Sequence, residues 1–377
     1  MPLNPFLKRL GPPLAVFLLA RLMIAIAALA LNLDPLDPVT FSRWDSGHYL
    51  HIADQGYELF SCDRIPGYDP EDWCGNTGWL PAYPWLMRLL SVTGLPTITA
   101  GVLLSAVFHL ATLIALYHYF LDATWNKRNA LCLLLAGFFP GCIYYHAVFP
   151  ISICTFCIVL MLHHLRQQRF LVAGLAGAAA AFTYSTGFVL AAVATAWLVW
   201  IGRGQPWRQR VPKLLITPGL TMLGFVLVLV LHHVVVGDWL AFFKVQAKYG
   251  HGIHIPIGIF YARIVPIVQP PWVWTQDVQA LQTFVVLCFV VAIAVTFFRQ
   301  RRLLNPQTIL LILFMFAFWL FPVITGPGVS SYRAESLLLP SVVLVRYLPW
   351  SVQVILTITA VLLAYPMTVL FYQHVLV

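Results

Sequence analysis

Long apolar runs alternate with short polar segments along most of this chain. A helix of about 20 apolar residues is long enough to cross the hydrocarbon core of a bilayer. The pattern therefore predicts an all-α polytopic membrane protein with about eleven spans, plus a short re-entrant or interfacial helix over 79–93. The expected spans cover residues 11–33, 97–121, 130–149, 151–165, 170–184, 187–202, 214–236, 278–298, 307–324, 336–348 and 351–372.

The charged residues between the spans predict the orientation of the chain. With the first span leading outward, 14 of the 22 Lys and Arg residues lie on the inner side, as the positive-inside rule requires. Nine of the 13 acidic residues lie between Asp34 and Asp72. We therefore expect one integral membrane domain over 1–377 in the plasma (inner) membrane. Its extracytoplasmic loops are expected at 34–78, 237–277 and 325–335.

Composition supports the membrane class and limits the partners. The chain is 60% hydrophobic and only 9% charged, whereas soluble domains carry roughly 25% charged residues. The net charge of +9 comes without a dense basic stripe, so a nucleic-acid partner is not indicated. The first apolar run resembles a signal peptide with a cleavage site at 28–30, but its length favours an uncleaved span.

The seven cysteines fall into two groups. Five lie in apolar runs and are expected to be buried small hydrophobic residues, including the pair Cys154 and Cys157. Cys62 and Cys74 instead share a polar loop rich in proline and glycine. A disulfide between them is expected if that loop is extracytoplasmic.

The first loop carries the strongest candidate chemistry. It reads RWDSGHYLHIADQGYE from Arg43 to Glu58. In a short helix, Asp45 and His48 share one face. A stretch that reads GWLPAYPWLMRLL, from Gly78 to Leu90, follows with aromatic residues suited to a membrane interface.

The other two loops supply cations. The second loop contains Lys244, Lys248 and His251 on an aromatic, apolar frame, and the third contains Arg333 and Glu335. One carboxylate opposite several cations suits sugar transfer from a polyprenyl phosphate. The phosphate leaving group needs cations rather than a proton, and the acceptor hydroxyl needs a base. Such a displacement inverts the anomeric centre.

These motifs resemble those of the PIG-V family of mannosyltransferases, which belongs to the GT-C fold class. The resemblance rests on RWDSGHYLHIADQGY followed by GWLPAYPWLMRLL. It is extended by FFPGCIYYHAVFP at 138–150, by GDWLAFFKVQAKYG at 237–250, and by Arg333 before a late span. Three segments depart from the family pattern, which leaves donor and acceptor identity open. They are Gly78-Trp79, Tyr184-Ser185-Thr186-Gly187 and the insert from Ser61 to Cys74.

The resemblance implies a GT-C-type fold, a polyprenyl-phosphate sugar donor that usually carries mannose, and a catalytic Asp in the first outer loop. That Asp corresponds to Asp45. The acceptor would be a glycolipid, a polymer or a protein hydroxyl, and membrane lipids surround the protein. No cofactor is expected to be required, although a divalent metal stays open. The expected substrate-binding residues are Arg43, His48, His51, Lys244, Lys248, His251 and Arg333.

Each of these residues also has a simpler interpretation. Asp45 could only cap the helix that begins at Ser46. His48 and His51, one turn apart, could bind a metal with Asp45 or only line an interfacial surface. The lysines and arginines could anchor lipid headgroups by snorkelling.

Two other function classes stay open. A lipid or lipid-linked-sugar transporter would depend on ionisable groups near the middle of the membrane, such as Arg21 and His232. A non-catalytic GT-C-like subunit would keep the fold without needing Asp45.

Overall fold

The computed structural model describes residues 5–326 and 331–376, and its regular elements are helices apart from one two-stranded hairpin. Six of the described helices are long and apolar enough to cross a membrane. Their lipid-facing sides expose large apolar side chains such as Leu22, Leu215 and Leu362. The chain is therefore a multi-pass membrane protein. The six helices are α1 (Pro5–Ala30), α4 (Thr97–Tyr119), α9 (Trp207–Val236), α12 (Trp274–Arg299), α13 (Pro306–Thr325) and α15 (Trp350–Tyr372).

Shorter helices fill the space between these spans. The helices α7 and α8 form the tight pair expected over 170–202, joined by the 3-10 turn η4 (Ser185–Phe188). Close packing of α7 on α9 depends on glycine, because a Cβ on Gly224 would lie 2.2 Å from the Ala178 carbonyl oxygen. The shorter helices are α5 (Lys127–Gly137), α6 (Ile151–Arg166), α7 (Phe170–Thr183) and α8 (Val189–Ile201).

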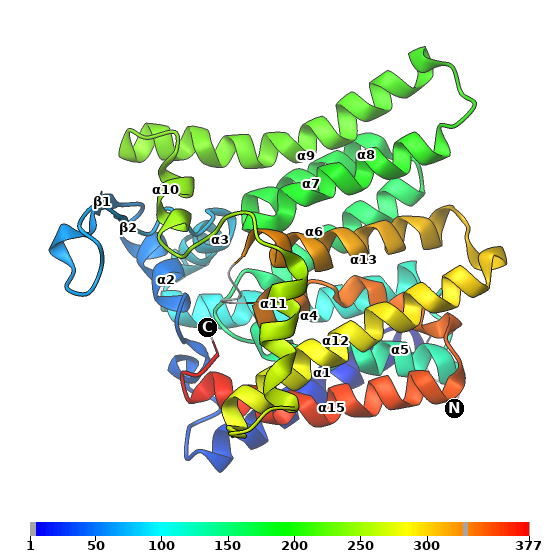
Figure 1. Ribbon diagram of the computed structural model, residues 1–377, viewed down its shortest axis with the longest axis horizontal. Coiled ribbons are helices and arrows are strands. Elements are labelled where there is room, and N and C mark those ends of the chain that lie inside the picture. Colours follow the sequence, from blue (N-terminus) through cyan, green and yellow to red (C-terminus); the bar gives the residue numbers. More distant parts are fainter. Residues whose placement is uncertain (1–4, 327–330, 377) are drawn as a thin grey trace.

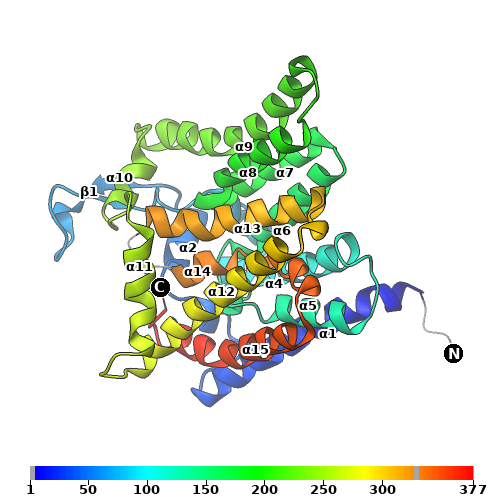
Figure 2. The same ribbon diagram turned by 45° about the vertical axis from the view of Figure 1, so that its right-hand side comes forward.

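The helices run roughly parallel in three layers (Figures 1 and 2). One layer contains α7, α8 and α9, a second contains α6 and α13, and a third contains α1, α12 and α15. One end of this bundle carries the small elements, among them α3, which confirms the expected short helix. They are α2 (Ser46–Asp54), α3 (Ala82–Ser91), α10 (Ala241–Ala247), α11 (Pro256–Ile264), α14 (Ser331–Ser336), β1 (Leu59–Ser61) and β2 (Trp73–Gly75).

Two expected spans are not continuous helices. The segment expected as 130–149 is helical only to Gly137 and then contains the 3-10 turn η3 (Cys142–Tyr145). The segment expected as 336–348 is mostly the 3-10 helix η7 (Leu339–Tyr347). Pro140, Pro150 and Pro340 lack the amide hydrogen that a helix needs. All residues from 138 to 150 are buried, and irregular backbone is tolerated at membrane depth when protein covers it.

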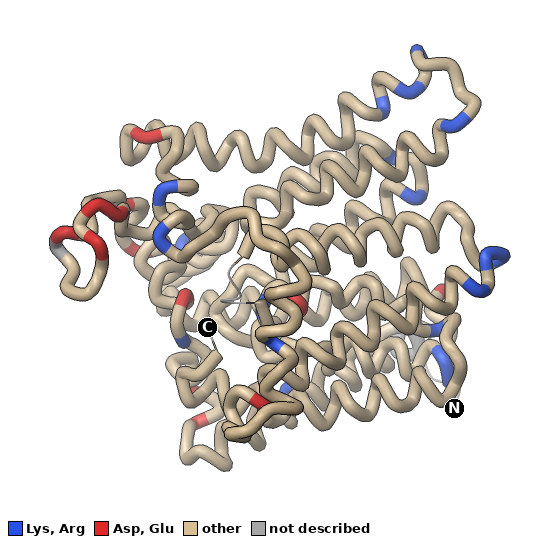
Figure 3. The backbone as a smooth tube through the Cα atoms, in the orientation of Figure 1, with Lys and Arg blue, Asp and Glu red and all other residues tan. Residues whose placement is uncertain are grey.

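Charge separates the two ends of the bundle. Figure 3 shows acidic residues gathered at the end that holds α2 and the β1–β2 hairpin, while basic residues mark the loops at the opposite end. The hairpin pairs Phe60 with Cys74 in antiparallel register, and a Cys62–Cys74 disulfide closes it. The disulfide expected from the sequence is therefore present. The remaining turns are η1 (Pro38–Phe41), η2 (Cys62–Arg64), η5 (Val265–Ile267) and η6 (Arg301–Leu303).

Candidate active site

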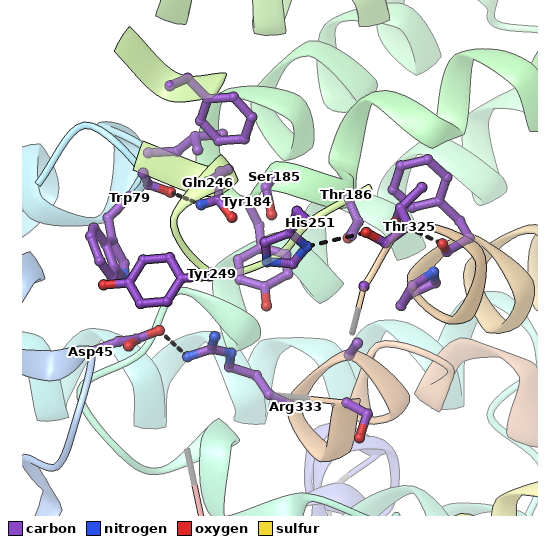
Figure 4. A pocket seen from close by; sticks show the side chains of 18 of the residues that line it. Asp45, Trp79, Tyr184, Ser185, Thr186, Gln246, Tyr249, His251, Thr325 and Arg333 are labelled. Carbon is purple, nitrogen blue, oxygen red and sulfur yellow. Dashed lines mark hydrogen bonds and ion pairs between the residues drawn. The ribbon is translucent and has the colours of Figure 1, made fainter. Parts of the chain in front are cut away.

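A cavity of about 420 Å³ is lined by residues of the first loop and of the segments near α10, α11 and α14. The first loop, the turn between α7 and α8, the segment after α10, and the end of α13 all contribute to its wall. Of the residues expected from the sequence, Asp45, His251 and Arg333 line this cavity, and Figure 4 shows them together. Three distant parts of the chain thus meet at one site.

Asp45 faces the cavity instead of capping the helix that follows it. It occupies the N-cap position of α2, but its side chain makes no capping hydrogen bond. The Nη1 atom of Arg333 donates to Asp45 Oδ2 in an ion pair instead (Figure 4). The preceding residue, Trp44, has a φ of 49°, which is uncommon for a residue with a side chain. The side chain of Asp45 therefore does not act as a helix cap here.

Arg333 is held in a buried, aromatic environment. Its side chain is only 10% exposed, and its guanidinium lies 5.3 Å from the centre of the Phe149 ring. Burial alone would lower the pKa of Arg333, but the Asp45 carboxylate and nearby tyrosine hydroxyls hold that pKa above its ordinary value. Arg333 therefore stays cationic and keeps the Asp45 carboxylate oriented.

Aromatic side chains form the wall beside Asp45. The Trp79 ring stacks on His48 with 3.5 Å between ring centres, and Tyr249 contacts Trp79 edge-on at 6.2 Å. The Tyr57 hydroxyl donates to the Trp79 carbonyl at 2.9 Å and fixes the backbone there. Burial lowers the pKa of His48, so this ring is neutral near pH 7. It stacks on Trp79 and is not among the residues that line the cavity.

The opposite wall is tied to the end of α13. The backbone nitrogens of Gly252 and His254 donate to the carbonyls of Thr325 and Ile324. The Nδ1 atom of His251 lies 3.4 Å from the Thr325 carbonyl oxygen. Burial lowers the pKa of His251, so this side chain is a neutral hydrogen-bonding group in the cavity at pH 7.

The two lysines expected to bind phosphate do not line the cavity. Lys244 pairs with Asp238 and lies 4.3 Å from the centre of the Trp73 ring. Lys248 lies over the rings of Tyr68 and Tyr249, at 4.7 and 4.8 Å. Both lysines therefore contact the disulfide-closed hairpin or its neighbours rather than the space in front of Asp45.

Arg43 and His51 are also engaged elsewhere. Arg43 donates to the backbone carbonyls of Val39, Ser42 and Tyr372, which fixes the first loop against the end of α15. His51 Nε2 lies 3.4 Å from Glu58 Oε1. Within the described residues, no group of three or more His, Cys, Asp or Glu side chains is placed to hold a metal ion.

Several cavity residues could not be identified from the sequence. Of these residues, Arg263 would have been the easiest to find in the sequence, because it is an isolated charge in an otherwise apolar stretch. The departure Tyr184-Ser185-Thr186 also lines the cavity, although nothing in the sequence placed that turn beside the first loop. The cavity residues that were missed include Tyr49, Trp79, Tyr184, Ser185, Thr186, Gln246, Tyr249, Arg263 and Thr325.

Comparison with known proteins gives a fold. No protein-family model matches the chain, and no curated protein sequence matches it. Two solved structures of an oligosaccharyltransferase from Archaeoglobus fulgidus are similar in three dimensions. The apo form has a TM-score of 0.50 at 11% identity over 94% of this chain, and the form tethered to an acceptor peptide has a TM-score of 0.53 at 11% identity over 97%.

This chain has a GT-C-type fold. The likeness covers 56% and 55% of the length of the two oligosaccharyltransferase chains, so this chain spans little more than half of them. At 11% identity the likeness concerns the arrangement of helices.

Proposed function

We propose that this protein is a GT-C-type glycosyltransferase that moves a hexose from a polyprenyl-phosphate sugar to an acceptor hydroxyl. The observation that carries the proposal is the Asp45–Arg333 pair inside a cavity at one end of a membrane-spanning bundle. The fold also resembles that of the oligosaccharyltransferase in the two solved structures.

Asp45 acts as the general base in this proposal. A hydroxyl that attacks an anomeric carbon gives up its proton during the reaction, and Asp45 is the carboxylate among the described residues that line the large cavity. The phosphate leaving group departs as an anion and needs positive charge. A single displacement of this kind inverts the anomeric centre.

The sugar and the family are finer parts of the same proposal. The motif around Asp45 resembles the PIG-V mannosyltransferases, so we propose mannose as the sugar. Trp79 and Tyr249 add aromatic lining to the cavity that contains Asp45, which suits the apolar face of a hexose ring. The acceptor is a glycolipid, a polymer or a protein hydroxyl, and no cofactor is required in this reaction.

Charge supports the proposed side of the membrane. The loops at the end opposite the cavity are rich in Lys and Arg, which is typical of cytoplasmic loops. A disulfide closes the hairpin next to the cavity, and disulfides persist in oxidising compartments. We therefore propose that the cavity faces the extracytoplasmic side of the plasma membrane.

Transfer by the purified protein tests this function. The wild-type chain in lipid nanodiscs is given labelled polyprenyl-phosphate mannose or glucose, with glycolipid, polymer and peptide acceptors offered separately. We expect label to move to one acceptor with inverted anomeric configuration, whereas nucleotide sugars give no product. Failure of every polyprenyl-phosphate sugar to donate would contradict the proposal.

A further inference from the structure

Arg263 is a second arginine at the cavity that no sequence motif singled out. It lies on α11 and lines both the large cavity and a small neighbouring cavity that Glu335 also lines. Its Nε atom, like that of Arg333, is buried without a hydrogen-bond partner among the described residues, but Arg333 already forms an ion pair with Asp45. An unsatisfied guanidinium donor in a low-dielectric environment favours an anion as its ligand.

Glu335 does not neutralise Arg263 by contact. The ion pairs of the described residues do not include these two side chains. Glu335 instead accepts a hydrogen bond from Gln282 Nε2 at 2.9 Å. Burial raises the pKa of Glu335 to about 7, so half of its population is uncharged near neutral pH. Arg263 therefore keeps a charge that this carboxyl group only partly offsets.

The described lining of the large cavity has an excess of one positive charge. Asp45 and Arg333 cancel one another as an ion pair, and Arg263 remains. Lys244 and Lys248 lie outside the lining. An occupant with a single negative charge balances this site, which is the charge of a phosphodiester. A sugar diphosphate lipid carries two negative charges and leaves an excess of one.

The position of α11 favours a phosphate that is attached to a lipid. Figures 1 and 2 show α11 lying across the ends of the long helices, and it has no buried residue. Its apolar side chains Ile257 and Tyr261 are 80% and 63% exposed, as expected for a helix that lies in the membrane interface. A phosphate bound by Arg263 can thus leave its hydrocarbon tail in the bilayer beside α11.

We infer that Arg263 binds the phosphate of a polyprenyl monophosphate sugar and that this site prefers one phosphate over two. This inference rests on the proposed glycosyltransferase function and assigns its donor phosphate to a residue. Arg333 is left to orient Asp45, so the two arginines have separate roles.

Direct binding tests the inference without requiring turnover. Wild type, Arg263→Gln and Arg263→Lys are placed in nanodiscs of zwitterionic lipid and titrated with a short-chain polyprenyl-phosphate mannose, a phosphodiester with one negative charge. A hydrogen bond to a charged group contributes enough for a change of about 10- to 100-fold in Kd. We expect that loss for Arg263→Gln and a smaller one for Arg263→Lys. The control is Arg302→Gln, since Arg302 is exposed in the loop between α12 and α13.

Competing ligands separate the possible sources of phosphate. We expect the polyprenyl-diphosphate sugar, with two negative charges, to bind wild type more weakly than the polyprenyl-monophosphate sugar. Inorganic phosphate lacks a hydrocarbon tail, and phosphatidylglycerol, although a singly charged phosphodiester, lacks the hexose that the cavity would hold, so both should compete poorly. Equal competition by either of these two, or tighter binding of the diphosphate, would overturn the inference.

A kinetic arm distinguishes failure of the inference from failure of the function. If wild type transfers sugar, Arg263→Gln should raise the KM for the donor about 10- to 100-fold and also lower kcat, because the leaving phosphate gains negative charge as its bond to the sugar breaks. An unchanged donor KM in an active enzyme would refute the role of Arg263 alone. A wild type that transfers no sugar, yet binds the polyprenyl-phosphate sugar through Arg263, would refute the function and support the site.

Discussion

Glu335 is a buried carboxyl group two residues after Arg333. Its side chain lies against Gln282 and near Arg263. Burial raises its pKa from 4.5 to about 7, so the folded protein holds a proton that the unfolded chain releases between these values. Stability therefore falls as pH rises through that window, because the native state binds more protons than the unfolded state there.

Glu335→Gln should remove this pH dependence. The variant keeps an oxygen that accepts from Gln282 but has no charge to bury. We expect it to be more stable than wild type above pH 7, by on the order of 3 kcal/mol, with the gain disappearing below about pH 4.5. Thermal unfolding in detergent from pH 4 to 8 measures the difference, with exposed Glu71→Gln as the control. A gain that does not vary with pH would contradict this account.

Individual site residues were predictable where the sequence concentrates charge in a motif. Asp45, His251 and Arg333 were expected and line the cavity. Lys244 was expected there as well, but a carboxylate six residues earlier in the chain pairs with it. Sequence shows that a residue is cationic and lies near an interface, but not which neighbour satisfies it.

At the scale of elements, the turn between α7 and α8 positions one wall of the cavity. It contributes Tyr184, Ser185 and Thr186 to the lining. The next residue, Gly187, packs against the backbone of α7. A Cβ on Gly187 would lie 2.3 Å from the Ala180 carbonyl oxygen. The chain can therefore return so closely after α7 only with glycine at this position.

Gly187→Ala should destabilise the protein and disturb this wall. Overpacking typically costs about 1–3 kcal/mol, so we expect a lower unfolding temperature and weaker donor binding. Gly219→Ala is the matched control, since a Cβ there meets nothing within 4 Å and alanine favours a helix. Equal unfolding temperatures for the two variants would show that the turn tolerates a side chain.

The elements were predictable where apolar runs are uninterrupted. The six long helices fall on expected spans, and α2 and α3 are the expected short helices. Residues 138–150 and 336–348 were not predictable, because a hydropathy pattern does not distinguish a lipid-facing helix from an irregular segment that protein buries. Prolines at 140, 150 and 340 were the available signal.

At the scale of the whole molecule, the two ends of the bundle carry opposite charge patterns (Figure 3). The pattern of Lys and Arg was sufficient to predict that the polar loops gather at one end. It could not predict the packing of α7 against α9 or the meeting of Asp45 with Arg333. Those contacts depend on side-chain shape between segments far apart in sequence.

The proposed orientation can be measured with single cysteines. Leu36→Cys lies in the first loop, where Leu36 is 88% exposed, and Arg203→Cys lies in the basic loop between α8 and α9. A membrane-impermeant maleimide added to intact cells should label Leu36→Cys, and Arg203→Cys only after permeabilisation, because the basic loop is expected inside. Wild type gives the background of the native thiols. The reversed labelling pattern would place the cavity on the cytoplasmic side.

The most direct test of the account is the transfer rate of purified Asp45→Asn. Asparagine still accepts a hydrogen bond from Arg333 but is not a base, so we predict a loss of about 10²- to 10⁴-fold in kcat. The unfolding temperature should stay near that of wild type. Exposed Asp69→Asn, in the same loop, should transfer normally. An Asp45→Asn protein that transfers mannose as fast as wild type would contradict the assignment of Asp45 as the base.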